Sequence, residues 1–265
     1  MLHLLIELTI IMISKAKIKQ IRLLEKKKYR DESKLFVAEG NKLVAEMIPF
    51  FECEWLIART SWIATQSNLP AKELIVADED DIQKVSFLKN PQDVLAVFRY
   101  PLYRIEEVNS SDELVLALDG IQNPGNLGTM IRLADWFGIG HIVCSQDTVD
   151  AFGIKAVQAS MGALTRVKIH YTNLEEYLSQ QNAPLYGTFL DGNSIYEKTL
   201  SSNGVIIIGN EGNGIRQSIE SLVNKRLFIP NFPPTRQRPD SLNAAMAAAI
   251  ICAEFRRTQS KRMEK

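Results

Sequence analysis

Residues 118–138, LDGIQNPGNLGTMIRLADWFG, contain the end of a predicted strand, a polar turn and a predicted helix. An apolar, β-branched run over 113–118 leads into this stretch and predicts a strand. The chain then breaks at Asp119-Gly120 and passes through an Asn-Pro-Gly-Asn loop. Apolar residues at helical spacing predict a helix over 128–137, with Arg132 off its apolar face. Such a glycine-rich turn between a strand and a helix presents backbone N–H groups at the carboxyl edge of a sheet, where α/β proteins bind ligands.

The composition is that of an ordinary globular protein. The chain has 265 residues, of which 46% are hydrophobic and 23% are charged, and its net charge is zero. Whole-molecule charge therefore says nothing about partners, but residues 15–34 contain nine Lys or Arg against three acids. Such a block fits a solvated helix face and a surface that binds a polyanion about equally well.

Cysteine and histidine give no metal-binding spacing. The three cysteines are far apart, as expected for small buried side chains in a reducing compartment: Cys53, Cys144 and Cys252. The three histidines also look isolated, so we expect structural roles for them: His3, His141 and His170. We expect His141 to open a strand, and we expect no bound metal.

Residues 1–13, MLHLLIELTIIMI, are apolar but short. They contain Glu7 and lack a basic start, so they fit neither a signal peptide nor a membrane span. Met12 is an alternative initiator, and we leave this segment out of the fold prediction. We expect a cytoplasmic protein with no membrane partner.

Residues 14–99 read as a small α/β unit. We predict a basic helix over 15–30, a strand over 36–40 and a helix capped by Asn41. Further elements are expected in this unit: strands at 54–58, 74–76 and 94–98, and a short helix at 78–81. Residues 100–113 are polar and contain Pro and Ser, so we take them as a linker.

From Leu114 onward, strands and helices alternate. Strands are expected at 114–118, 140–145, 165–170, 185–190, 204–209 and 226–230, and helices at 128–137, 152–161, 173–182, 215–223 and 242–257. This alternation predicts a largely parallel sheet with helices on both faces. The last helix is apolar on nearly every side over 242–253, so we expect it to be buried all round, with Asp240 or Ser241 as its cap. Such a helix either threads into its own domain or forms a subunit interface.

Two further polar, glycine- or amide-rich segments follow predicted strands. The second motif is 208–214, IGNEGNG, and the third runs from Ile229-Pro230 through a long loop to 240–243, DSLN. The carboxyl ends of parallel strands lie at one edge, so the three segments can converge there, although each alone is weak evidence. The dinucleotide-binding, P-loop and serine-hydrolase fingerprints are absent, which argues against those classes.

In this order, the three motifs resemble those of the SpoU/TrmH-type RNA ribose 2′-O-methyltransferases of the SPOUT superfamily. The resemblance covers residues 114–257. It implies a deep trefoil knot in an α/β methyltransferase domain over 114–265, and a homodimer. The unit at 14–99 is similar to the RNA substrate-binding domain of the family, carried here by the basic helix, Arg30 and the strand at 36–40. The implied partner is RNA, either tRNA or rRNA.

The implied cofactor is S-adenosyl-L-methionine. The resemblance assigns five residues to its binding: Gly209, Asn210, Gly214, Ile229 and Leu242. It makes Arg132 the central catalytic residue, and four others shape the site or the substrate: Asn126, Glu211, Ser241 and Asn243. Because arginine keeps its proton in proteins, we assign Arg132 as a phosphate clamp and as a stabiliser of the developing alkoxide, and leave the destination of the proton open. Without the other motifs, an ion pair between Arg132 and Asp135 would be the simpler interpretation.

The third motif departs from the family pattern. It is four residues longer, has Asn231 in place of Met, lacks the usual Gly, and carries Arg236 and Arg238. We hypothesise that loop 231–240 reaches RNA phosphate; the alternative is a solvated insertion. Two other functions stay open: an RNA-binding protein of this fold that has lost catalysis, and an enzyme that methylates a base nitrogen.

Overall fold

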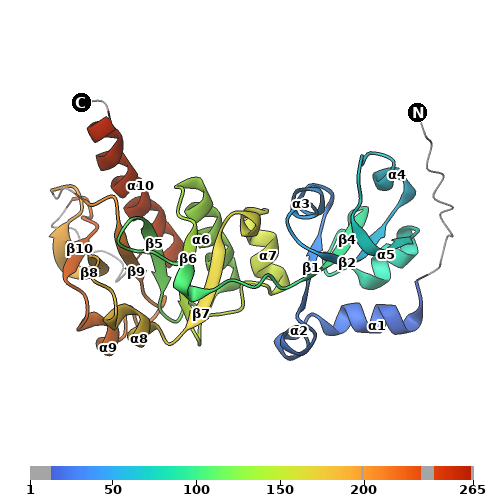
Figure 1. Cartoon of the computed structure of the whole chain (residues 1–265), viewed down its shortest axis with the longest axis horizontal. Helices are drawn as coiled ribbons and strands as arrows, with labels where there is room; N and C mark the ends of the chain where they lie inside the picture. The colour runs from blue at the N-terminus through green and yellow to red at the C-terminus, as the bar shows by residue number, and fades with distance from the viewer. Residues whose placement is uncertain (1–12, 198–199, 234–241, 264–265) are drawn as a thin grey trace. The chain divides into compact units, whose positions relative to one another are not determined.

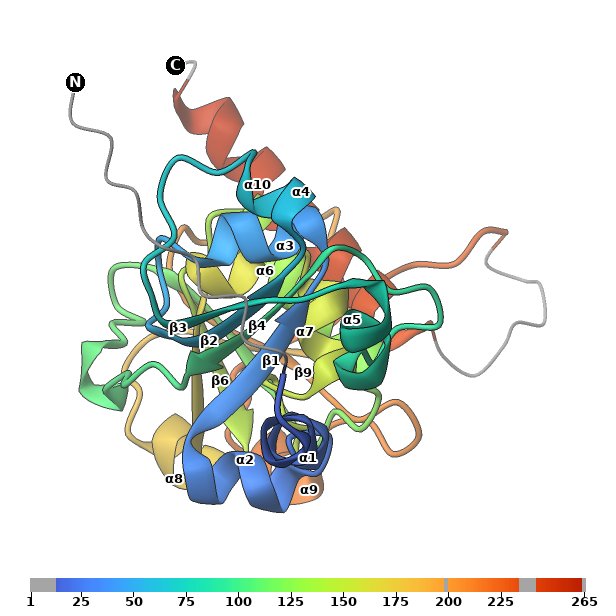
Figure 2. The same cartoon turned by 90° about the vertical axis from the view of Figure 1, so that its right-hand side faces the viewer.

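The computed structural model describes residues 13–197, 200–233 and 242–263. Residues 1–12 and the third-motif residues Arg236, Arg238, Asp240 and Ser241 therefore lie outside the described part. The chain divides into two compact units, one formed by Met1–Pro101 with Phe152–Gln158 and the other by Leu102–Ala151 with Ala159–Lys265. Figures 1 and 2 show the elements of both. Within the described ranges, no helix combines the length and the apolar character needed to cross a membrane.

The first unit is built on a four-stranded sheet of order β1-β4-β2-β3, in which only the β2–β3 pair is parallel. Ile21, Leu24, Ile82 and Val85 pack with residues of the strands to form its apolar core. Its elements are α1 (Lys15–Leu23), α2 (Lys27–Ser33), β1 (Leu35–Glu39), α3 (Asn41–Met47), β2 (Cys53–Ala58), α4 (Thr60–Ile63), β3 (Ala71–Val76), α5 (Glu79–Val85) and β4 (Val94–Arg99).

The second unit contains a six-stranded sheet of order β10-β8-β9-β5-β6-β7, in which every pair is parallel. This confirms the predicted parallel α/β sheet. Its elements, with α7 (Ile154–Ser160) starting in the first unit, are η1 (Ile105–Glu107), β5 (Leu114–Leu118), α6 (Pro124–Trp136), β6 (His141–Ser145), η2 (Ala163–Thr165), β7 (Lys168–Thr172), α8 (Leu174–Ser179), β8 (Leu185–Ser194), β9 (Gly204–Ile208), α9 (Gln217–Glu220), β10 (Lys225–Phe228) and α10 (Ala244–Met263).

Helices cover both faces of this sheet. Alternate residues of β5 and β9 pack with Leu174, Leu178 and Ile219 of α8 and α9 on one face. On the other face, α6 and α10 pack against each other (Figure 1). Because β5, β6 and β9 are buried along their whole lengths, their sequences are continuous apolar runs and do not alternate.

The basic segment forms two helices, so the prediction of one helix over 15–30 was wrong. α1 ends at Leu23 and α2 begins at Lys27. The guanidinium of Arg30 donates to the carbonyls of Leu24 (2.7 Å) and Glu25 (2.8 Å) and thereby satisfies backbone groups where the chain turns. Arg30 is only 4% exposed, so its side chain serves the fold and is not presented to RNA.

Other boundaries also differ from the prediction. Gly40, not Asn41, precedes α3, and the Asn41 side chain accepts from the amide of Asp93 at 3.1 Å. β7 starts three residues later than expected because a 3-10 turn occupies 163–165. The short helix α4 was missed. Residues 102–113, expected within a linker, belong to the second unit, where Ile105 and Val108 pack against its core.

α10 is not buried all round within one chain. Its buried residues form one stripe that includes Ala245, Ala248, Ile251 and Phe255, whereas Met246 is 60% exposed. The side-chain oxygen of Asn243 accepts from the amides of Ala245 (3.0 Å) and Met246 (3.2 Å), so Asn243 caps this helix. The prediction that Asp240 or Ser241 caps the helix was therefore wrong, because the cap is Asn243, the residue directly before α10.

Candidate functional site

The first motif forms a turn and the start of α6 directly after β5. Asn123 caps the helix, because its Oδ1 accepts from the amides of Gly125 (2.8 Å) and Asn126 (3.2 Å), and Pro124 occupies the first helical position. α6 therefore begins four residues earlier than predicted. As a result, Asn126 lies in the first helical turn, at the electropositive end of α6.

The second motif forms a closed loop directly after β9. Two backbone hydrogen bonds join Asn210 and Gly214, with N···O distances of 2.9 and 3.0 Å. The side-chain oxygen of Asn210 accepts from the amides of Gly212 (2.8 Å) and Asn213 (3.0 Å). Its amide nitrogen donates to the carbonyl of Gly120 at 2.6 Å, which ties the second motif to the turn of the first. Glu211 stands inside this constrained loop.

One chain of hydrogen bonds connects the three motifs. Asn243 Nδ2 donates to Asn126 Oδ1 at 3.1 Å, and Asn126 Nδ2 donates to Glu211 Oε1 at 2.9 Å. The direction is fixed, because the oxygen of Asn243 is occupied by the amides at the start of α10 and a carboxylate can only accept. The orientation of both amides follows from this order. Asn126, Glu211 and Asn243, all expected at the site, are thus brought together.

Glu211 is held as a carboxylate. Its oxygens also accept from the backbone amides of Gln122 (3.2 Å) and Asn123 (3.3 Å). Burial acts to raise the pKa of Glu211, but the hydrogen bonds from Asn126 and from the backbone outweigh it and lower the pKa. The site therefore contains a fixed negative charge that orders the loop after β5.

The site lies at the topological switch point of the sheet. β5 and β9 are neighbours, yet the chain runs from β5 outward to β6 and β7 on one side, and β9 lies on the other. Loops that leave such a pair of parallel strands diverge, and ligands of open α/β sheets bind in the crevice between them. The first and second motifs are those two loops.

Arg132 is exposed on α6, and none of the described residues forms a hydrogen bond or an ion pair with it. The alternative interpretation, a pair with Asp135, is wrong. Both oxygens of Asp135 instead accept from Arg166 Nε at 2.9 Å. The guanidinium of Arg132 is therefore available to an anionic ligand.

The residues expected at the cofactor are distributed over two strand ends and the start of α10. Gly209, Asn210 and Gly214 belong to the loop after β9, and Ile229 follows β10. In the sheet, β8 lies between β9 and β10. Leu242 is 53% exposed. Ser241 lies outside the described residues.

Sequence reasoning missed the residues that support these loops. Arg216 contacts Asp119 and Asp147, and Ser145 accepts the amide of Gly120 at 2.8 Å. Asp119 belongs to the first motif, and its position directly after a buried strand was the available signal. Nothing in the local sequence identified its partners, because they come from separate segments of the chain.

The sequence suggested that the histidines are isolated, but two of them are in contact. His141 begins β6 as predicted, and its Nδ1 lies 3.0 Å from Nε2 of His170, with the two rings stacked. Burial lowers the pKa of both, that of His170 to about 4. The three cysteines are free and buried, as expected. Among the described residues, no group of three His, Cys, Asp or Glu side chains could hold a metal ion.

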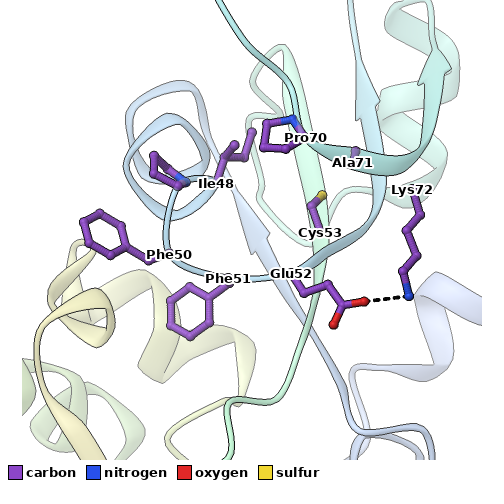
Figure 3. Close-up of a pocket in the computed structure, with 9 residues that line it drawn as sticks. Ile48, Phe50, Phe51, Glu52, Cys53, Pro70, Ala71 and Lys72 are labelled. Carbon is purple, nitrogen blue, oxygen red and sulfur yellow. Dashed lines mark ion pairs between the residues drawn. The ribbon is translucent and has the colours of Figure 1, made fainter.

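The first unit contains a hollow of about 540 Å³ lined by nine residues, among them Phe50, Cys53, Pro70 and Lys72 (Figure 3). Lys72, its one cationic lining residue, pairs with Glu52 at 2.6 Å and with Glu54 at 3.2 Å. A cation neutralised in this way attracts an anionic ligand weakly. The loops after β5 and β9 are therefore the stronger candidate site.

Comparison with known proteins identifies the family. The model of the SpoU rRNA Methylase family matches residues 113–253, which include all three motifs. This chain belongs to the SpoU rRNA Methylase family. An MRM3-like substrate binding domain model matches residues 15–96, which lie in the first unit.

RNA methyltransferases from several bacteria resemble the chain over nearly its whole length. The 23S rRNA (guanosine(2553)-2'-O)-methyltransferase RlmP of Bacillus subtilis (strain 168) is 31% identical, and the match covers 91% of this chain and 96% of that protein. The structure of an AdoMet-bound rRNA methyltransferase from Sinorhizobium meliloti superposes with a TM-score of 0.79 at 31% identity, covering 91% of this chain and 94% of the other. A structure assigned to the TrmH family of RNA methyltransferases, from Porphyromonas gingivalis, gives a TM-score of 0.85 at 38% identity, with coverages of 93% and 99%.

Proposed function

We propose that this protein transfers a methyl group from S-adenosylmethionine to a ribose 2′-hydroxyl of RNA, with rRNA as the substrate. The observation that carries the proposal is the hydrogen-bond chain from Asn243 through Asn126 to Glu211. It joins three motifs that are far apart in the sequence at the switch point of β5 and β9. The 23S rRNA methyltransferase RlmP, which matches nearly the whole chain, supports rRNA over tRNA.

The residues near the strand ends fit the proposed cofactor. Adenine needs apolar contacts and backbone donors and acceptors, and needs no charged partner. Ile229 and Leu242 are partly or largely exposed apolar side chains, and the space next to Gly214 is open, with no atom within 4 Å of the position of a Cβ. The loop from Gly209 to Gly214 supplies backbone groups. We therefore assign cofactor binding to Gly209, Asn210, Gly214, Ile229 and Leu242, as the family resemblance implies.

When bound, S-adenosylmethionine would supply an activated methyl group for the ribose 2′-oxygen. The chain contributes position and charge. Arginine side chains are cations in proteins, so we assign Arg132 to hold an RNA phosphate and to stabilise the negative charge that develops on the 2′-oxygen. Asn126 and Glu211 fix the amides after β5, and Asn243 joins α10 to them. The family resemblance assigns Ser241 a role in shaping the site or holding the substrate. Correct positioning alone lowers the barrier by about 7–11 kcal/mol.

We also propose that RNA is first held by the first unit. The match of an MRM3-like substrate binding domain supports this role. Of the nine cations in the basic segment, Lys17 pairs with Glu73 and Arg30 is buried, whereas Lys26–Lys28 are exposed at the corner between α1 and α2. Exposed lysines of this kind attract the phosphate backbone in a salt-dependent manner.

A homodimer, a trefoil knot and a cytoplasmic location remain predictions. The dimer is supported by exposed apolar side chains on the two packed helices α6 and α10. Trp136 is 81% exposed, and Met246 lies on the uncovered side of α10. Aromatic and methionine side chains are enriched in the buried centres of subunit interfaces. The knot is implied by the family resemblance and agrees with the packing of α10 against α6.

The experiment uses the full-length protein, radiolabelled S-adenosylmethionine and rRNA from cells that lack the gene. We expect label in a 2′-O-methylated nucleoside after nuclease digestion and mass spectrometry, and loss of labelling with Arg132→Ala. Label in a methylated base would support the base-nitrogen alternative. RNA binding without methyl transfer would support the alternative of a binding protein.

A further inference from the structure

Arg216 joins the ends of three adjacent strands. Its Nε lies 2.6 Å from Oδ1 of Asp119, and its backbone amide donates to Oδ2 of the same residue at 2.8 Å. Its NH2 group donates to both oxygens of Asp147, at 2.9 and 3.0 Å. Asp119 follows β5, Asp147 follows β6, and Arg216 itself follows the loop after β9. In the sheet these strands are neighbours, in the order β9-β5-β6 (Figure 1).

We call the contacts of Arg216 with Asp119 and Asp147 the Arg216 clamp. This clamp contains a buried charge. Asp119 is 1% exposed, and burial raises its pKa, while Arg216 opposes that shift. A buried carboxylate is strongly destabilising unless it is paired and hydrogen-bonded. Asp147 is more exposed, and its hydrogen bond with Ser145 and the pairing with Arg216 lower its pKa. Arg216 therefore compensates the carboxylate at the start of the first motif.

The clamp also lies against the turn that feeds the candidate site. Gly120 has a φ of +69°, and a Cβ placed on it would lie 3.4 Å from NH2 of Arg216. The Gly120 carbonyl accepts from Asn210 Nδ2, and Ser145 accepts from the Gly120 amide. The backbone amides of Gln122 and Asn123, two and three residues after Gly120, donate to the Glu211 carboxylate.

We propose that Arg216 is a positioning residue for methyl transfer: by fixing the Asp119-Gly120 turn between the loops after β6 and β9, it sets where the Gln122 and Asn123 amides meet Glu211. This proposal rests on the function proposed above. Arg216 does not contact the reacting atoms in this account. It acts through Gly120 and the chain of amides that follows, and so it controls the rate of the bound complex more than RNA affinity.

The first test compares Arg216→Met and Arg216→Lys with the wild type in the full-length protein. Single-turnover methylation is measured with saturating S-adenosylmethionine and rRNA, alongside the Kd for RNA and the melting temperature. A displacement of about 1 Å far from the reacting atoms can slow a reaction about a hundredfold, so we expect a loss of that order for Arg216→Met with an RNA Kd within about twofold. Arg216→Lys recovers only part of the rate, because an ammonium group cannot reproduce the contacts of a planar guanidinium with two carboxylates.

The matched control is Lys168→Met. Lys168 forms an ion pair of 2.8 Å with Glu107. It is the first residue of β7 and so lies at the amino ends of the strands, whereas the Arg216 contacts lie at the carboxyl ends. We expect this variant to keep the wild-type rate within about twofold, as is usual for an exposed pair. A comparable loss of rate in both variants would overturn the proposal, because any lost ion pair would then have the same effect.

A double variant separates position from stability. Arg216→Met combined with Asp119→Asn removes the uncompensated buried charge but does not restore the clamp. We expect its melting temperature to recover relative to Arg216→Met, while the rate stays low. If rate and melting temperature recover together, Arg216 is only a stabilising partner and the proposal is overturned. A wild-type protein that fails to methylate RNA would instead overturn the proposed function, so the two failures are distinguishable.

Discussion

Three glycines in the loop after β9 allow a graded test of cofactor binding. A Cβ on Gly209 would lie 2.2 Å from the carbonyl carbon of Gly214 and 2.3 Å from the amide nitrogen of Ile215, so the backbone must move. A Cβ on Gly212 would meet nothing closer than 3.5 Å. Gly214 has open space but a φ of +70°, which is unfavourable for alanine. The three positions therefore differ in the strain that the same substitution introduces.

The expected magnitudes follow from these contacts. Gly209→Ala disrupts the two backbone bonds between Asn210 and Gly214, worth about 1 kcal/mol each, and adds about 1–3 kcal/mol of steric strain. A total of about 3–5 kcal/mol leaves the closed loop under about 1% populated, so the affinity for S-adenosylmethionine falls about a hundredfold or more. Gly214→Ala costs about 1–2 kcal/mol and lowers affinity about tenfold. Gly212→Ala stays within about twofold.

The assay is calorimetric titration of each full-length variant with S-adenosylmethionine, with the melting temperature as a check on folding. The order of affinity loss is predicted to be Gly209→Ala, then Gly214→Ala, then Gly212→Ala. Wild-type affinity in Gly209→Ala would refute the role of this loop in cofactor binding. Equal losses in Gly209→Ala and Gly212→Ala would refute the steric reasoning.

Three further predictions concern other parts of the chain. Burial lowers the pKa of His170 from 6.5 to about 4 in the folded state. Between these pH values the unfolded state therefore binds more protons than the folded state. The free energy of unfolding is highest above pH 6.5 and falls by about 3 kcal/mol as the pH falls toward 4. Urea unfolding at several pH values should show a weaker pH dependence in His170→Phe, and an unchanged one would contradict this linkage. Trp136→Glu and Met246→Glu are predicted to give monomers in sedimentation velocity without lowering the melting temperature, whereas intact dimers would exclude this face as the interface. Replacing Lys26–Lys28 by Ala should weaken RNA binding and reduce the salt dependence of log Kd by up to about 2–3 units; an unchanged slope would place the RNA contacts elsewhere.

The arrangement of the site was predictable because it follows from topology. Continuous apolar runs identified β5 and β9 as buried strands, and the carboxyl ends of parallel strands lie at one edge. The convergence of the first and second motifs follows from that alone. The early start of α6 was also readable, since Asn123-Pro124 is a capping residue followed by a proline suited to the first helical position.

Other features depend on contacts between distant segments and could not be read from local sequence. Arg30 looked like an exposed cation in a basic block, but its guanidinium satisfies carbonyls at the end of α1. His141 and His170 meet because β6 and β7 are neighbours in the sheet. The apolar pattern of the last helix predicted burial on every side, but it could not show that one chain covers only one side of α10.

A crystal structure of the full-length protein with bound S-adenosylmethionine tests directly whether the three motifs form the cofactor site. We predict that the ligand contacts the backbone of the Gly209–Gly214 loop and the side chains of Ile229 and Leu242. We also predict that the Asn243–Asn126–Glu211 hydrogen bonds are intact and that the guanidinium of Arg132, from either subunit, faces the methyl group. A ligand bound away from the loops after β5 and β9, or an Arg132 that faces no cofactor, would contradict it.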